Sequence, residues 1–212
     1  MTDPGMPAAR RRDASATRAA ILASARRAFA RAGYDGAGVR EIAAGAGVTA
    51  MMVNRYFGSK ERLFAEAIAS YMAEPEILTR TNLESPDFAA RIAGILVDIT
   101  KAGATPLDGF LIMLHSSSSE RAAEIGREQI ERHYHRTLTE TLGGDLAGER
   151  AGILLAMVAG VQVMRQMIGL SALAHADPDD LAAILEPLFR QLLAPGAATD
   201  PPVPPGRDPD TR

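Results

Sequence analysis

Hydrophobic positions recur at helical spacing along most of the chain. Apolar side chains three or four residues apart mark one face of a helix, whereas a half-buried strand would alternate with a period of two. No stretch alternates in that way, so the pattern predicts an all-α protein. Helices are expected at 17–33, twice within 39–57, and at 60–72, 88–99, 107–115, 119–142, 148–170 and 177–193.

The segment 39–57 carries the most specific pattern. Ala43 is small enough for a second helix to cross close by, Gly47 tolerates the left-handed backbone of a tight turn, and Val53 fills the crossing from the other side. A small residue, a glycine and an aliphatic residue at this spacing are typical of a helix-turn-helix, whose second helix lies in the DNA major groove. An ordinary helical hairpin is the alternative, because 19 of the 212 residues are glycine.

The flanking residues extend this pattern. A Gly-Val-Thr turn at 47–49 is followed by Tyr-Phe-Gly-Ser-Lys-Glu at 56–61, and Ser59 is placed to cap the next helix. Over roughly residues 17–72 the chain resembles the TetR family of transcriptional regulators. The resemblance implies a three-helix DNA-binding head, a larger helical body that binds a ligand, and a homodimer that represses transcription until a small molecule releases it from operator DNA.

The chain is expected to divide into four parts. They are a flexible basic arm at 1–14, a helix-turn-helix DNA-binding domain at 15–60, a helical ligand-binding and dimerisation domain at 61–194, and a disordered proline-rich tail at 195–212. Thr17 is expected to cap the first helix. The three arginines at 10–12 could reach a phosphate or the minor groove, or could belong to a solvated tail.

Charge supports the division into head and body. Residues 1–62 contain 11 Lys and Arg against 5 Asp and Glu, whereas the rest contains 12 against 21. Positive charge is therefore concentrated where DNA contact is expected. The absence of cysteine excludes disulfides and thiolate metal sites, and the lack of a signal-peptide pattern favours a cytoplasmic protein.

The second helix of the motif supplies the expected DNA contacts. Asn54 and Arg55 can hydrogen-bond the edges of adenine and guanine. Family members usually have an aromatic residue in place of Asn54 and often Gly or Pro in place of Met51, so the operator sequence cannot be borrowed from relatives. The residues expected to contact bases are Ala50, Met51, Asn54 and Arg55. The residues expected to contact phosphates are Thr49, Tyr56 and Lys60. Further candidates for phosphate contacts are Thr17, Arg18 and Arg40.

The helix at 148–170 is apolar on nearly all sides. Its uninterrupted apolar run, 151–161, is too short to cross a bilayer, so no membrane contact is expected. Small residues every fourth position (Gly152, Ala156, Gly160) allow another helix to approach closely. This pattern predicts a homodimer through 148–170 and 177–193; a central helix in a monomeric bundle is the alternative.

A ligand pocket follows from the resemblance and from a methionine-rich body. The effector would be a small apolar or amphipathic molecule of unknown identity. A constitutive DNA-binding protein that senses nothing would have the same head and remains the alternative. The expected pocket residues are Phe88, Ile92, Phe110, Met113, Met157 and Gln162, with His115 or His133 as a polar group.

Catalytic patterns are missing from the sequence. It contains no HExxH, no GxSxG and no glycine-rich phosphate loop, and the serines at 116–119 are expected to form a helix junction. His133 and His135 are two residues apart and would point to different sides of a helix, which does not suit a shared metal. We therefore expect no catalytic residue, metal or cofactor; a helical-bundle enzyme is the second alternative function.

Overall fold

The computed structural model describes residues 8–73, 77, 79–83, 85–101 and 108–194, and all regular structure in these ranges is helical. The prediction of an all-α fold is confirmed. The first helices are α1 (Ala8–Gly36), α2 (Val39–Gly45), α3 (Ala50–Phe57) and α4 (Lys60–Met72). The remaining ones are α5 (Arg80–Leu83), α6 (Phe88–Ile99), α7 (Asp108–Ser116), α8 (Glu120–Ile130), α9 (Arg136–Leu142), α10 (Ala147–Gln162), α11 (Ser171–Ala174) and α12 (Pro178–Leu193).

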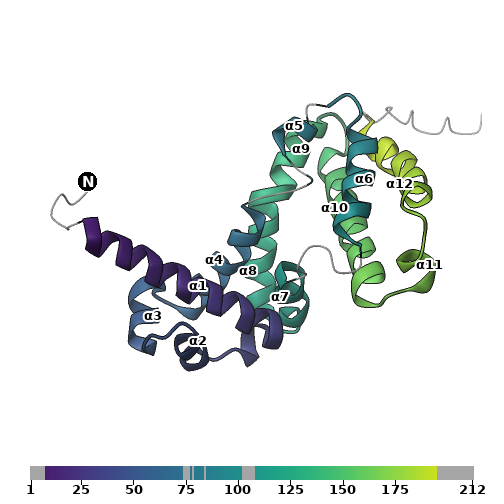
Figure 1. Cartoon of the computed structure of the whole chain (residues 1–212). Helices are drawn as coiled ribbons and strands as arrows, with labels where there is room; N and C mark the ends of the chain where they lie inside the picture. Colours follow the sequence, from purple (N-terminus) through teal and green to yellow (C-terminus); the bar gives the residue numbers. More distant parts are fainter. Residues whose placement is uncertain (1–7, 74–76, 78, 84, 102–107, 195–212) are drawn as a thin grey trace, which may run out of the picture.

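Two π-helical turns interrupt the longer helices. The first, η1 (Glu131–His135), joins α8 to α9, and the second, η2 (Val163–Met167), extends α10. Figure 1 shows α1, α2 and α3 at one end of the molecule and α6, α10 and α12 at the other, with α4 and α8 leading from one end to the other. We call α1–α3 the head.

The buried apolar residues form two separate clusters. The first core is built by α1–α4 together with α7 and α8, and the second core by α6, α9, α10 and α12. The head therefore shares its core with α4, α7 and α8. In the first core the rings of Phe29 and Phe64 meet edge to face with centroids 5.0 Å apart, and those of Tyr34 and Phe64 with centroids 4.9 Å apart.

Hydrogen bonds and a close approach join α1 to α7. His115 Nδ1 donates to the Ala30 carbonyl at 2.7 Å, and the Tyr34 amide donates to Ser116 Oγ at 2.9 Å. Gly33 breaks α1 with φ +67°, and a Cβ atom there would lie 2.2 Å from the carbonyl oxygen of His115. Only glycine fits at this crossing.

Side-chain caps explain where several helices begin. Ser59 Oγ accepts the Arg62 amide at 3.2 Å, as the sequence predicts, and Asp177 Oδ1 accepts the Asp179 amide at 2.9 Å at the start of α12. The expected cap at Thr17 is wrong. Because α1 already begins at Ala8, Thr17 lies inside the helix and its hydroxyl donates to the Asp13 carbonyl at 2.8 Å.

The first helix also reaches into the expected flexible basic arm at 1–14, because α1 begins at Ala8. The tail at 195–212, residues 1–7, and the side chains of the three arginines at 10–12 lie outside the described part of the chain. The stretch Ala147–Met167 is long and apolar enough to cross a membrane by length and composition alone, a test that core helices also pass.

Two buried arginines tie helix ends together in the body. Arg150 donates to the carbonyl oxygens of Gly143, Leu192 and Ala194, at the ends of α9 and α12. Arg165 donates to the Val97 carbonyl at 2.6 Å and to Thr100 Oγ1 at 2.9 Å, at the end of α6. A guanidinium satisfies the free carbonyls of a helix C-terminus and suits its negative dipole end. These contacts fix how α6, α9 and α12 surround α10.

Candidate DNA-binding surface and effector cavity

The turn between α2 and α3 has the predicted geometry. Ala43 and Val53 are each only 2% exposed, and Gly47 adopts φ +68°. The Val48 amide donates to the Ala43 carbonyl at 3.0 Å, which closes the turn after α2. Thr49 then begins α3, its hydroxyl accepting the Met52 amide at 3.4 Å. The helix-turn-helix is confirmed as a local structure.

The two sides of α3 differ in what they present. Val53 and Phe57 are buried in the first core, whereas Met51, Asn54 and Arg55 are exposed. Residues three and four positions apart lie on the same face of a helix, so these three side chains form one outward surface. Met51 is 81% exposed. Ala50, also expected to read bases, is half-buried against the first core.

The expected phosphate contacts lie at the ends of the helices around α3. Thr49 and Arg40 are exposed, and Tyr56 is half-buried against the first core. Lys60, at the start of α4, has its Nζ 4.6 Å from the centroid of the Tyr34 ring. Burial, followed by the nearby Glu61 and Asp35, raises the pKa of Tyr34, so this phenol stays neutral beside the ammonium.

Arg18 has partners within the protein. Its guanidinium pairs with Glu66 on α4 and lies 4.8 Å from the centroid of the Phe57 ring. These contacts tie the middle of α1 to α4 and to the end of α3. Phe57 itself is buried in the first core, which joins the head to body helices. The structure thus gives Arg18 a packing role and places Thr17 in the interior of α1.

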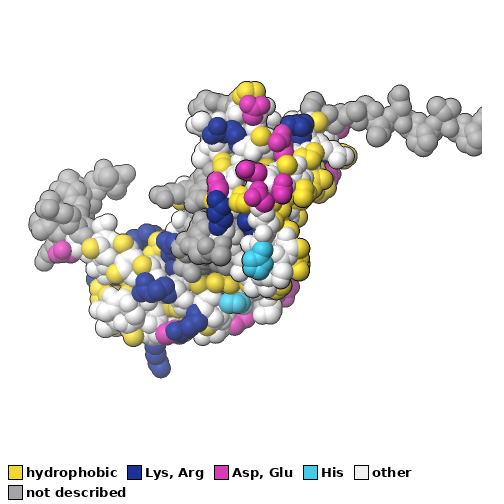
Figure 2. Space-filling view, turned by 45° about the vertical axis from the view of Figure 1, so that its right-hand side comes forward, with side chains coloured by type: hydrophobic (Ala, Val, Ile, Leu, Met, Phe, Trp, Pro, Cys, Tyr) yellow, Lys and Arg dark blue, Asp and Glu magenta, His cyan; other side chains and the backbone are white. Residues whose placement is uncertain are grey.

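Charge is distributed unevenly over the surface. Figure 2 shows Lys and Arg side chains over the head at the lower left and a cluster of Asp and Glu side chains on the upper part of the molecule. This matches the basic excess of residues 1–62 and the acidic excess of the remainder. A basic surface on the head attracts the phosphate backbone, while the acidic body is repelled by it.

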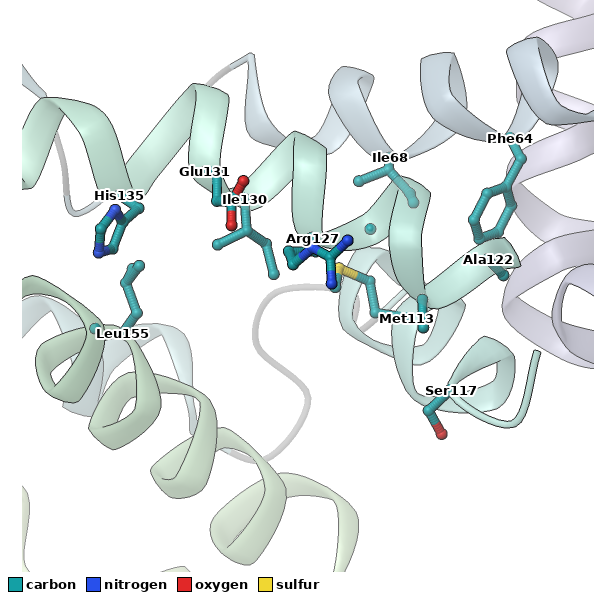
Figure 3. Close-up of a pocket in the computed structure, with 13 residues that line it drawn as sticks. Phe64, Ile68, Met113, Ser117, Ala122, Arg127, Ile130, Glu131, His135 and Leu155 are labelled. Atoms are coloured by element: carbon teal, nitrogen blue, oxygen red, sulfur yellow. The ribbon is translucent and has the colours of Figure 1, made fainter. Parts of the chain in front are cut away.

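Two adjoining cavities lie between the first and second cores, with volumes of about 430 and 390 Å³. Both are lined by Ile68, Met113, Ile130 and Leu155, so they meet along these four side chains. Figure 3 shows the first cavity, with Phe64 and Ile68 from α4 on one side and His135 with Leu155 at the opposite end. Residues of α4, α7, α8, η1 and α10 therefore line the same space.

The cavity walls are mainly apolar, with a few polar groups. Arg127, Glu131 and His135 line the first cavity, and Tyr134 and Gln162 line the second. His135 Nε2 donates to the Gly148 carbonyl at 2.9 Å, which orients the ring between η1 and α10. Burial raises the pKa of the Tyr134 phenol, so at neutral pH it can still donate a hydrogen bond. Such a lining suits an amphipathic molecule.

The residues expected to line a pocket fall in several places. Phe110, Met113 and Gln162 line the cavities. Phe88 and Ile92 are buried in the second core, and Met157 is half-buried against it.

Neither expected histidine lines the two cavities. His115 binds the Ala30 carbonyl, and His133 is half-buried on η1. Phe64 and Ile68 are wall residues and His135 is the histidine at the cavity, and none of the three was expected there from the sequence. The apolar face of α4 was the available signal for the first two; the π-helical turn that orients His135 leaves no sequence pattern.

Comparison with known protein families agrees with this geometry. The model described as "Bacterial regulatory proteins, tetR family" matches residues 21–67. The model described as "Tetracyclin repressor-like, C-terminal domain" matches residues 87–193. A search of curated proteins finds no match.

Solved structures share the fold over most of the chain. NalD, the secondary repressor of the MexAB-OprM multidrug efflux pump in Pseudomonas aeruginosa, is 22% identical with a TM-score of 0.61, covering 84% of this chain and 96% of NalD. Salmonella enterica GusR is 19% identical with a TM-score of 0.64, covering 84% and 95%.

A transcriptional regulator from Rhodococcus sp. Rha1 is 26% identical with a TM-score of 0.56, covering 83% of this chain and 95% of that regulator. The helix-turn-helix geometry, the basic head and the two family matches lead to one conclusion. The chain belongs to the TetR family of DNA-binding transcriptional regulators.

Proposed function

We propose that this protein is a transcriptional repressor that binds operator DNA as a homodimer and is released when a small amphipathic molecule enters the cavities between its two cores. DNA-binding regulation and dimerisation come with the family. Ligand-dependent repression is typical of the family, and NalD is a repressor by its description. The site residues and the dimer face below are part of the proposal.

The position of the cavities supports the proposed release by a small molecule. Their walls include Phe64 and Ile68 on α4, which belong to the first core, and Leu155 on α10, which packs against the second. A molecule held there contacts both cores at once. It can shift the equilibrium only if it binds one arrangement of the cores more tightly than the other. The arrangement it favours would place the two heads of the dimer wrongly for successive major grooves.

The dimer face is proposed on α10, η2 and α12. Ile153, Ile168 and Ile184 are 52%, 65% and 63% exposed, although isoleucine is among the residues most often buried. Gly160 on α10 and Leu188 on α12 are also exposed. Apolar surface of this extent on two neighbouring helices is typical of an interface. A symmetric pair of such faces would form a four-helix contact and hold the heads one helical turn of DNA apart.

The proposed DNA contacts combine the surface of α3 with its flanks. Asn54 and Arg55 are exposed on α3 and carry the hydrogen-bonding groups that read purine edges. Thr49, Tyr56, Lys60 and Arg40 surround them and are proposed to bind phosphates. Tyr56 and Lys60 also pack within the protein, so their contribution to DNA affinity is expected to be smaller than that of a free side chain.

The proposal is tested by filling the cavity. Gly152 was expected with Ala156 and Gly160 in a strip facing another helix, but it lines the first cavity. A Cβ atom there would have no atom within 4 Å, so a larger side chain enters open space at the cavity wall. Gly152→Leu is expected to keep operator affinity within about twofold while abolishing release by compounds that act on the wild type. Gly94→Leu is the matched control, since Gly94 also has open space around it but lies on α6, outside both cavities.

The measurement uses fluorescence anisotropy of an operator duplex selected from random DNA. Decanoate, decanol, decylamine and uncharged aromatic compounds are added as probes, and the melting temperature is followed in parallel. Release of wild type and of Gly94→Leu, but not of Gly152→Leu, supports the proposal. Equal release of all three proteins by one probe would contradict the cavity as the effector site.

A further inference from the structure

Met51 is the most exposed large hydrophobic side chain in the described part of the chain, at 81%. It stands on the head, at the second position of α3. Several other exposed large hydrophobic residues belong to the proposed dimer face: Ile153 on α10, Met164 on η2, Ile168 just after it, and Ile184 and Leu188 on α12. The exposure of Met51 is therefore not explained by the proposed dimer face.

The fold of α3 leaves Met51 outside the hydrophobic clusters formed by the described residues. Val53 and Phe57 anchor the opposite side of the helix in the first core. The neighbouring Met52 is half-buried, which shows that a methionine in this turn can pack when it faces inward. Because Thr49 caps α3, Met51 lies in its first turn. The N-terminal residues of a recognition helix are those that contact base edges.

The chemistry of the major groove limits what an apolar side chain can read there. The C5-methyl group of thymine is the apolar feature of the base pairs in that groove, and apolar side chains recognise it by contact. Methionine is unbranched and flexible, so its terminal methyl can adjust to such a contact. A polar or charged residue at the same position would instead recognise a hydrogen-bonding group on a base edge.

We propose that Met51 contacts the 5-methyl group of a thymine in each operator half-site and so determines part of the sequence specificity. The proposal rests on α3 being the base-reading helix. Asn54 and Arg55 follow Met51 by about 4.5–6 Å along the helix axis, at about 1.5 Å per residue. Base pairs are spaced by about 3.4 Å. The thymine is therefore expected one or two base pairs from the purine read by Asn54 or Arg55.

The test removes only the methyl group. The full-length protein first selects its operator from random duplexes, and each thymine of the half-site is then replaced by deoxyuridine, which keeps the base pairing. One symmetric pair of positions is expected to weaken binding of the wild type by about fourfold per half-site, the effect of one buried methyl group. Met51→Ala should bind the thymine operator more weakly by a similar factor and should not distinguish thymine from uracil.

Two variants make the result specific. Met52→Ala removes the neighbouring methionine and should still distinguish the two bases, as should Asn54→Ala. A selected half-site without thymine, a wild type indifferent to every uracil substitution, or a Met51→Ala variant that still prefers thymine would each overturn the proposal for Met51. If no sequence is enriched at all, the assignment of α3 as base-reading helix fails as well, so the two failures are distinguishable.

Discussion

The two hydrophobic cores differ in how completely one chain encloses them. In the first core, Phe29 and Phe64 are wholly buried, and helices from the head and the body surround them. In the second, α12 buries Leu185 and Phe189 on one side while Ile184 and Leu188 face solvent on the other. The first core can thus hold the DNA-reading surface in shape within a single subunit. In the proposed dimer, the exposed side of the second would be covered by the same surface of a second subunit.

This difference bears on the proposed effector site. The helix-turn-helix, α4, α7 and α8 share one core, so they are expected to move together. The cavities lie where this unit meets α10. In the proposed function, a shift between the two cores would change the position of the head relative to the dimer face without disturbing the head itself. The following predictions, from the largest expected effect to the smallest, test how far the two regions differ.

Phe29→Ala should produce the largest loss of stability. The ring is fully buried and contacts the rings of Tyr34 and Phe64. Replacing a buried phenylalanine by alanine typically lowers the free energy of unfolding by 3–5 kcal/mol, and we expect about 4 kcal/mol here. Urea unfolding at a fixed protein concentration measures it. A loss below about 1 kcal/mol would show that the first core is not closed as described.

Leu188→Glu should break the contact that completes the second core. A carboxylate buried without a partner in the dimer face is expected to weaken dimerisation by about 3 kcal/mol, or roughly 100-fold. Sedimentation at micromolar concentration should show monomer, and operator affinity should fall with it. Leu114→Glu is the control, because Leu114 is exposed on α7, which belongs to the first core and lies outside the proposed dimer face. A variant at Leu188 that stays dimeric would remove α12 from the interface.

Gly33→Ala should strain the junction between α1 and α7. Its backbone, with φ +67° and ψ −175°, is nearly exclusive to glycine, and the new Cβ would lie 2.2 Å from the His115 carbonyl oxygen. We expect a loss of about 2–3 kcal/mol in the free energy of unfolding. Gly47→Ala is the matched comparison: it has φ +68° but no atom within 4 Å, so about 1–2 kcal/mol is expected. Equal losses would show that α7 does not press on α1.

Glu41→Gln should have the smallest effect. Glu41 on α2 pairs with Arg31 on α1, and both side chains are largely exposed. Exposed ion pairs contribute about 1 kcal/mol or less, and salt weakens them further. The same urea titration should therefore hardly distinguish this variant from the wild type. A loss above about 2 kcal/mol would mean that the head depends on surface charge rather than on the first core.

Local features of the fold could be predicted because each depends on neighbouring residues alone. The turn at Gly47 follows from the backbone freedom of glycine, and the starts of α4 and α12 follow from the caps at Ser59 and Asp177. Thr17 carries the same type of side chain as a cap but lies in the interior of α1, because Ala8 already starts that helix. A capping residue marks a possible start, and the surrounding sequence decides whether it is used.

The candidate cavity was predicted only in part, because it depends on how helices pack. Phe88 and Ile92 look like pocket residues on an apolar helix face, yet α6 turns that face toward α12 in the second core. His133 and His135 could not be distinguished from sequence, since the π-helical turn that carries both changes the helical register locally. Phe64 and Ile68 lie on the apolar face of α4, and only the packing of the helices makes that face a wall shared between the two cores.

The sequence alone determined the helical periodicity, the helix-turn-helix, the concentration of basic charge in the first 62 residues and the apolar character of α10 and α12. These properties are read from residues close together along the chain. The tertiary structure decided that the head shares its core with α7 and α8, that Arg18 forms an ion pair with Glu66, and that α4 lines the cavities. Such contacts join residues far apart in sequence, and packing rather than local preference selects among the possible partners.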